Sequence, residues 1–226
     1  MTKRGFIEPL VQKSTPSIIA EKLRLAIGHG ELPAGSQLYE AELARELGVS
    51  RGPLREGMQR LTQEGLLISI RNRGLFVIQM TPENVRDMYL ARGAIERVAA
   101  EHIMRGDPTD AVDALLAVVE TMDKAGARKQ VSRMTEADMT FHQTLVSWAR
   151  SPRLSRIHET LLTETRLCIT ALEESYRFSD DRVEEHRAIA QAIGARDSAL
   201  TDRLLIAHMD DAVRRLTISP AAASGS

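Results

Sequence analysis

The order of elements predicted between residues 40 and 78 constrains the fold of this chain more than any other feature. A short amphipathic helix over residues 40–47 runs into Gly48, whose backbone freedom suits the tight bend between two packed helices. Ser50 stands where it can cap the next helix. Two short helices joined by such a bend predict a helix-turn-helix, whose second helix packs through an apolar stripe of Leu54, Met58 and Leu61.

Segments on both sides of this pair complete the predicted unit. Upstream, residues 19–27 carry apolar side chains at helical spacing before the glycine- and proline-rich residues 28–35 end the helix. Downstream, apolar runs over residues 66–70 and 75–78 are joined by Arg71-Asn72-Arg73-Gly74, in which Asn and Gly supply turn chemistry. The sequence therefore predicts three helices followed by a β-hairpin wing.

Positive charge on this unit indicates what it contacts. The first 80 residues hold 11 Lys and Arg against 8 Glu and no Asp, whereas the remainder of the chain is net acidic. Arg51, Arg55 and Gln59 stand four residues apart on a helix face separate from the apolar stripe, and such side chains read base edges in the DNA major groove. Arg71 and Arg73 at the wing tip suit the flanking backbone or minor groove. Charge alone leaves a solvated helix face as the alternative.

Beyond residue 80 the pattern is helical throughout. Thr81 followed by Pro82 predicts an N-cap with proline at the first helical position. About six helices and no strand pattern follow, with breaks at residues 106–108, near Gly126, at residues 151–152, around residues 179–180 and at residues 194–197. The predicted fold class is mainly α: a winged helix-turn-helix domain over residues 10–79 and an all-α antiparallel helix bundle over residues 82–218.

Four residues of the predicted bundle are candidate metal ligands. Asp138 and His142 stand one helical turn apart and share a helix face. His186 and His208 fall on consecutive helices whose junction lies midway between them, so antiparallel packing brings the two rings to the same level. Three imidazoles and a carboxylate suit Zn²⁺, Ni²⁺ or another divalent ion. In a chain with 6 histidines, a chance Asp/His pair is the alternative.

The remaining reactive side chains predict no further chemistry. His102 and His158 have no partner at metal spacing and are predicted to lie at the surface or in interhelical hydrogen bonds. Cys168, the single cysteine, lies in a helical apolar pattern and is predicted to be a buried small side chain. No apolar segment approaches the length of a membrane span, and the tail over residues 221–226 is predicted to be disordered.

The N-terminal unit resembles the winged head of the GntR family of regulators, through Leu43-Ala44-x-x-Leu47-Gly48-Val49-Ser50-Arg51, Pro53-Leu54-Arg55-Glu56, Leu61-x-x-Glu64-Gly65-Leu66 and Asn72-x-Gly74-x-Phe76-Val77. The resemblance implies that Arg51 and Arg55 contact bases or phosphates. It implies that Ser50 contacts a phosphate and that Gly74 lets the wing approach the minor groove. One departure is Ala41, which stands where some relatives carry an arginine that contacts DNA.

The body resembles the FCD effector domain of the FadR-like branch of that family, through Arg92-x-x-Ile95-Glu96-x-x-Ala99-Ala100, Asp138-x-x-x-His142, Glu185-His186-x-x-Ile189 and Ala207-His208. The resemblance implies that Asp138, His142, His186 and His208 bind a divalent metal. It implies that an organic acid completes the coordination of this metal. It also implies that the fork of Arg92 binds the carboxylate of that acid. An intrahelical ion pair between Arg92 and Glu96 is the alternative.

These observations predict a cytoplasmic, ligand-responsive transcriptional regulator, and in particular a repressor that senses a small carboxylate. Because one recognition helix reads few base pairs, we expect a homodimer on a palindromic double-stranded DNA operator. The alternatives are a metal-dependent enzyme and an architectural DNA binder. The sequence contains neither a His-Glu-x-x-His nor a Glu-x-x-His motif, so it favours a regulator with no enzymatic activity.

Overall fold

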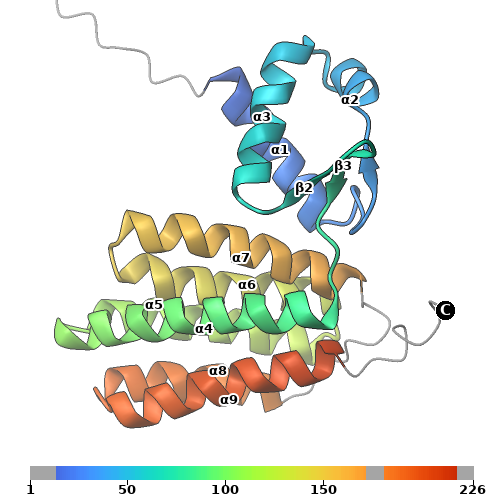
Figure 1. The fold of residues 1–226 in the computed structure, drawn as a ribbon. Helices are drawn as coiled ribbons and strands as arrows, with labels where there is room; N and C mark the ends of the chain where they lie inside the picture. Colours follow the sequence, from blue (N-terminus) through green and yellow to red (C-terminus); the bar gives the residue numbers. More distant parts are fainter. Residues whose placement is uncertain (1–13, 172–180, 218–226) are drawn as a thin grey trace, which may run out of the picture.

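A computed structural model describes residues 14–171 and 181–217, which form a small head above a helical body (Figure 1). Mainly α structure, with a small sheet in the head, confirms the predicted fold class. The predicted tail over residues 221–226 and the predicted break around residues 179–180 lie outside the described residues. The outer ends of the two predicted domains, residues 10–13 and residue 218, lie outside them as well. The head consists of α1 (Thr15–Gly28), β1 (Gln37–Leu38), α2 (Glu40–Leu47), α3 (Arg51–Gln63), β2 (Leu67–Ile70) and β3 (Gly74–Val77).

Local chemistry explains the helix limits in the head. The Ser14 side chain accepts a hydrogen bond from the backbone N–H of Ser17, which caps the start of α1. Gly48 ends α2 with φ 63°, in the left-handed region where glycine has no steric penalty, and so provides the predicted bend into α3. The three helices enclose one apolar core that includes Ile27, Leu54 and Leu61, each fully buried.

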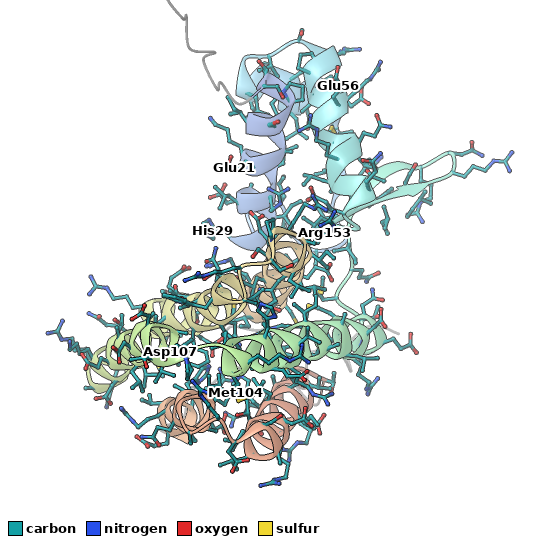
Figure 2. The ribbon with its side chains drawn as sticks, turned by 90° about the vertical axis from the view of Figure 1, so that its left-hand side faces the viewer. Glu21, His29, Glu56, Met104, Asp107 and Arg153 are labelled. Carbon is teal, nitrogen blue, oxygen red and sulfur yellow. The ribbon has the colours of Figure 1, made fainter. Side chains whose placement is uncertain are left out.

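The wing contains a strand that the sequence pattern did not indicate. β2 and β3 form the predicted antiparallel hairpin, with Ile70 opposite Gly74. β1 pairs with the other edge of β3 and gives the sheet order β1-β3-β2. Because β1 has only two residues, it shows no alternation from which a strand could be predicted. Figure 2 shows the hairpin reaching out from the rest of the head.

The body contains six helices among the described residues, as predicted. Thr81 caps α4 by accepting a hydrogen bond from the backbone N–H of Asn84, and Pro82 is the first helical residue. The main core is formed by residues of α4, α5, α6, α8 and α9 and includes Leu115, Phe141 and Ile189. The helices are α4 (Pro82–Arg105), α5 (Thr109–Ala127), α6 (Val131–Trp148), α7 (Pro152–Ala171), α8 (Asp181–Gly194) and α9 (Ser198–Thr217).

The head rests on the body through the C-terminal end of α1 and one face of α7. Leu167 of α7 is 1% exposed because it packs within the core of the head. The hydroxyl of Thr170 donates to the backbone carbonyl of Gly28 across 3.3 Å. In Figure 2, His29 at the end of α1 lies next to the helices of the body. The two parts therefore share packed side chains as well as the chain segment before α4.

One single-residue prediction and the predicted lack of a membrane span concern this body. Cys168 is fully buried, which confirms the prediction, and burial raises the pKa of its thiol to about 12. Its sulfur is therefore protonated at neutral pH and behaves as a small apolar group. Within the part of the chain that the structure describes, no helix is long and apolar enough to cross a membrane.

Glu164 of α7 makes the stability of the body depend on pH. Burial, with a smaller contribution from the Asp87 carboxylate, raises the pKa of Glu164 from 4.5 to about 7. Its contribution to stability is therefore fully present below about pH 4.5 and is lost as the pH rises through about 7. We expect Glu164→Gln, which cannot ionise, to raise the Tm at pH 8 by about 2–4 °C per kcal/mol regained and to have little effect at pH 4.5.

Thermal unfolding followed by circular dichroism at the two pH values measures this difference. Glu159→Gln is the matched control, because Glu159 lies on the same helix but is exposed. An equal change in Tm at both pH values for Glu164→Gln would contradict the prediction.

Candidate functional site

The predicted ligand cluster forms in the interior of the body. Asp138 and His142 come from α6, His186 from α8 and His208 from α9, and all four side chains are buried. One ligand atom from each residue lies within 4.8 Å of every other. The Nε2 atom of His142 is 3.3 Å from Nε2 of His186 and 3.2 Å from Nε2 of His208. Asp138 Oδ1 lies 3.3 Å from His186 Nε2.

The opposite nitrogen of each imidazole faces a hydrogen-bond acceptor. His142 Nδ1 lies 2.7 Å from Glu96 Oε2, and His208 Nδ1 lies 3.1 Å from Glu185 Oε2. His186 Nδ1 lies 2.7 Å from the backbone carbonyl oxygen of Arg182. These acceptors place a proton on each Nδ1, so that in the neutral rings each Nε2 carries a lone pair. Three lone pairs consequently point to one place inside the body.

The electrostatics of the cluster keep three of the donor groups, Asp138, His142 and His186, free of an added proton. Burial, helped by the charge of Arg92, lowers the pKa of His142 to about 4, although Glu96 opposes the shift. Burial also lowers the pKa of His186 well below its ordinary value. Burial alone would raise the pKa of Asp138, but the facing imidazoles and Arg182 outweigh it and hold that pKa below its ordinary value. Near neutral pH His142 and His186 are neutral and the carboxylate is ionised.

This donor set fits a divalent metal ion. Tetrahedral zinc with Zn–N distances of about 2.0–2.1 Å separates its ligand atoms by about 3.3 Å. The Nε2 separations of 3.2 and 3.3 Å around His142 match that spacing. Asp138 Oδ1 is buried and accepts no hydrogen bond from the described residues, which fits a ligand oxygen. A cation would relieve the repulsion between the lone pairs and supply a partner to that oxygen.

Arg92 of α4 lies beside this cluster and is 1% exposed. Its Nε donates to Glu96 Oε1 over 2.7 Å, so the ion pair considered as an alternative is formed. Its Nη1 donates to the hydroxyl of Thr165 over 3.3 Å, whereas its buried Nη2 has no hydrogen-bond partner among the described residues. Arg92, Asp138 and His208 line the same small cavity, which has room for about one water molecule.

Sequence reasoning missed the residues that surround the ligands. The sequence marked Glu96 as a possible ion-pair partner of Arg92 and as part of the FCD-like motif, yet its buried carboxylate also contacts His142 and His158. The predicted interhelical hydrogen bond of His158 is confirmed, because its Nε2 lies 3.0 Å from Glu96 Oε1. His102 is exposed, as predicted. The signals in the sequence for Glu96 were its position one helical turn after Arg92 and its place in the FCD-like motif.

The recognition face is present on α3. Arg51, Arg55 and Gln59 are exposed on this helix, away from its packed stripe. Ser50 occupies the N-cap position, but its side chain makes no capping hydrogen bond. Arg55 Nε donates to Glu40 Oε2 of α2 over 2.7 Å in an exposed ion pair. An exposed pair of this kind contributes little stability, so Arg55 can exchange it for an anionic ligand.

The wing presents the other predicted side chains. Arg71 and Arg73 are exposed in the turn between β2 and β3, and the Arg73 guanidinium lies 5.5 Å from the Phe76 ring centroid. Gly74 has φ 106°, which favours glycine, and an added Cβ would lie 3.0 Å from Gln37 Nε2. That amide also donates to the backbone carbonyl of Arg73 over 2.6 Å, so β1 braces the turn.

Comparison with known proteins assigns the head and the body to known families. Residues 17–77 match the family described as bacterial regulatory proteins, gntR family, and residues 87–211 match the FCD domain. The chain belongs to the GntR family. It is a transcriptional regulator with a DNA-binding head and an FCD effector domain, and it is not an enzyme.

Individual GntR relatives agree with this assignment. The chain is 33% identical over 157 residues to an HTH-type transcriptional regulator of Agrobacterium vitis encoded in the TAR-I ttuE-ttuC' intergenic region, covering 65% of this chain and 92% of that one. It is 27% identical to the gluconate operon transcriptional repressor of Bacillus licheniformis, covering 89% and 85%. A crystal structure of a GntR regulator from Rhodococcus sp. RHA1 superposes with a TM-score of 0.75 at 26% identity, covering 90% of this chain and 98% of that chain.

Proposed function

We propose that this GntR regulator is a homodimeric repressor, acting in the cytoplasm, that responds to a small organic acid at a metal-containing site. The observation that supports the sensor is the convergence of three Nε2 lone pairs and Asp138 Oδ1 at a cavity that Arg92 also lines, with its Nη2 lacking a partner within the described part of the chain. The metal ligands are Asp138, His142, His186 and His208, and the ion is Zn²⁺ or Ni²⁺.

The acid is bound by complementary charges in this proposal. A divalent ion would supply a Lewis-acidic anchor for a carboxylate oxygen. The Arg92 guanidinium offers Nη2, which has no hydrogen-bond partner among the described residues, to the same carboxylate, as an arginine fork does for planar anions. Because the cavity has room for about one water molecule, an acid has to displace its walls on entering. Acid binding therefore favours a different arrangement of the helices around the cavity.

Helix α7 connects this movement with the head. Its Thr165 accepts a hydrogen bond from Arg92, and its His158 contacts Glu96. Leu167 and Thr170 of the same helix contact the head. A shift of α7 relative to α4 would thus change the position of the head on the body. An acid that binds one of the two arrangements more tightly would then shift the population toward that arrangement.

The heads of two protomers would read the two halves of a palindromic operator. Arg51, Arg55 and Gln59 would contact base edges in the major groove, while Ser50 would contact a phosphate. The wing residues Arg71, Arg73 and Gly74 would lie against the backbone or minor groove.

A thermal-shift screen of small organic acids against zinc-loaded and metal-stripped protein tests the sensor. We expect at least one acid to raise the Tm strongly only when zinc is present, because both ligands share one site. An acid that stabilises the stripped and loaded proteins equally would place its site away from the metal. The same acid should change operator affinity in a gel-shift assay at constant salt, since salt itself weakens DNA binding.

Replacing a recognition arginine tests the DNA face. We expect Arg51→Ala to weaken operator binding by about 1–3 kcal/mol, because the guanidinium offers bidentate contacts in the groove. Gel-shift titrations with operator and unrelated DNA measure the loss and its sequence dependence. Arg105→Ala is the control, since Arg105 is exposed at the far end of α4 from the head. Equal operator affinity for the Arg51 and Arg105 variants would exclude this face.

A further inference from the structure

Glu96 of α4 occupies an unusual position beside the proposed sensor site. Its carboxylate is fully buried, although no ligand atom of the metal cluster comes from this residue. One oxygen, Oε2, lies 2.7 Å from His142 Nδ1. The other, Oε1, accepts from Arg92 Nε over 2.7 Å and lies 3.0 Å from His158 Nε2. One carboxylate therefore contacts both a candidate metal ligand and the candidate acid-binding arginine.

The contact with His142 decides which nitrogen of that ring can bind a metal. An ionised carboxylate is only an acceptor, so it requires the ring proton on Nδ1. The lone pair is then on Nε2, which faces His186 and His208. If the proton moved to Nε2, it would occupy the place where the metal should bind.

The contact with Arg92 fixes the orientation of the guanidinium. Glu96 holds Nε and Thr165 holds Nη1, so Nη2 is the guanidinium nitrogen left without a hydrogen-bond partner among the described residues, in a side chain that lines the ligand cavity. Without these acceptors, the long side chain would regain rotamer freedom and lose its orientation toward an acid.

We propose that Glu96 is a positioning residue for both ligands of the sensor: Oε2 sets the metal-binding tautomer of His142, and Oε1 aims Arg92 at the acid. The proposal rests on the proposed function, in which the metal and the acid share this cavity. Carboxylates behind a histidine ligand orient the ring and raise its basicity. Here the same carboxylate also orients the arginine, so the two binding affinities depend on one side chain.

The variant Glu96→Gln tests this dual role. An amide has one acceptor oxygen, which cannot replace both carboxylate oxygens. If that oxygen stays with Arg92 and His158, the amide NH₂ faces His142 Nδ1 and drives the ring proton to Nε2. We expect the zinc affinity, measured by competition with a chromogenic chelator, to fall about 10–100-fold. If the amide instead turns its oxygen toward His142, its NH₂ opposes Arg92, and acetate affinity of the zinc-loaded protein falls.

Glu101→Gln is a matched control for this substitution. Glu101 also lies on α4 and pairs with an arginine one turn away, Arg105, but both side chains are exposed and neither contacts the cluster. We expect this variant to bind zinc and acetate like the wild type. A folded Glu96→Gln protein that matches Glu101→Gln in both affinities would overturn the proposal.

A measurement on the wild type decides the first half of the proposal even if Glu96→Gln does not fold. Long-range ¹H–¹⁵N spectra of the metal-stripped protein at neutral pH distinguish the two neutral imidazole tautomers. We expect His142 to carry its proton on Nδ1, and a proton on Nε2 would refute the role of Oε2. Failure of the wild type to bind either zinc or nickel would instead refute the proposed sensor, and the tautomer would still show whether Glu96 positions His142.

Discussion

Zinc is expected to raise the Tm of the metal-stripped regulator by about 8–16 °C when its concentration is about 1,000 times the Kd. An ion that binds only the folded protein at this ratio adds about 4 kcal/mol of stability, and each kcal/mol moves the Tm of a chain of this size by about 2–4 °C. The folded state alone brings the four donors together, because they come from α6, α8 and α9. Differential scanning calorimetry with chelator and with zinc or nickel measures the effect.

A ligand variant separates specific binding from general effects of the ion. His186→Ala removes one Nε2 donor, so we expect most of the zinc-dependent rise in Tm to disappear. His102→Ala removes an exposed histidine of α4 and is expected to keep the full rise. Comparison of the zinc-dependent shifts, rather than of the Tm values, cancels the cost of the cavity left by the deleted ring. Equal shifts in both variants would rule out the cluster as the zinc site.

The positions of the four candidate ligands could be predicted because helix geometry links spacing to direction. Asp138 and His142 share a face at any packing, and the midpoint of His186 and His208 falls in the short segment between α8 and α9. Their separations depend on how three helices pack, so the sequence could not provide them. The role of Glu96 depends on the same packing, since His158 is 62 residues away from it.

The fold of the head was predictable for a different reason. Gly48 and the wing turn impose local backbone geometry that does not require distant contacts. β1 exists only because an edge of β3 is available to it, and the ion pair of Arg55 with Glu40 depends on the angle between α2 and α3. Local signals therefore defined the elements and the β2–β3 hairpin, while the pairing of β1 with β3 and the ion pair between α2 and α3 became visible only in the structure.

The packing of α7 on the head gives the second large expected effect. Leu167→Ala should destabilise the regulator by about 2–5 kcal/mol, as for other buried leucines truncated to alanine. It should also weaken the response to acid, because Leu167 lies in the core of the head while Thr165 of the same helix contacts Arg92. The measurement is the ratio of operator affinities with and without the most stabilising acid from the thermal-shift screen. That ratio is typically about 5–150 in coupled systems and should fall toward 1.

Leu115→Ala distinguishes lost coupling from lost stability. Leu115 is also fully buried, but it packs in the main core of the body, which contains no residue of the head. Both substitutions should lower the Tm similarly, whereas only Leu167→Ala should reduce the acid response. If Leu167→Ala keeps the wild-type ratio, α7 is not the connection. The movement must then reach the head through α4, which carries Arg92 and follows the wing directly in the chain.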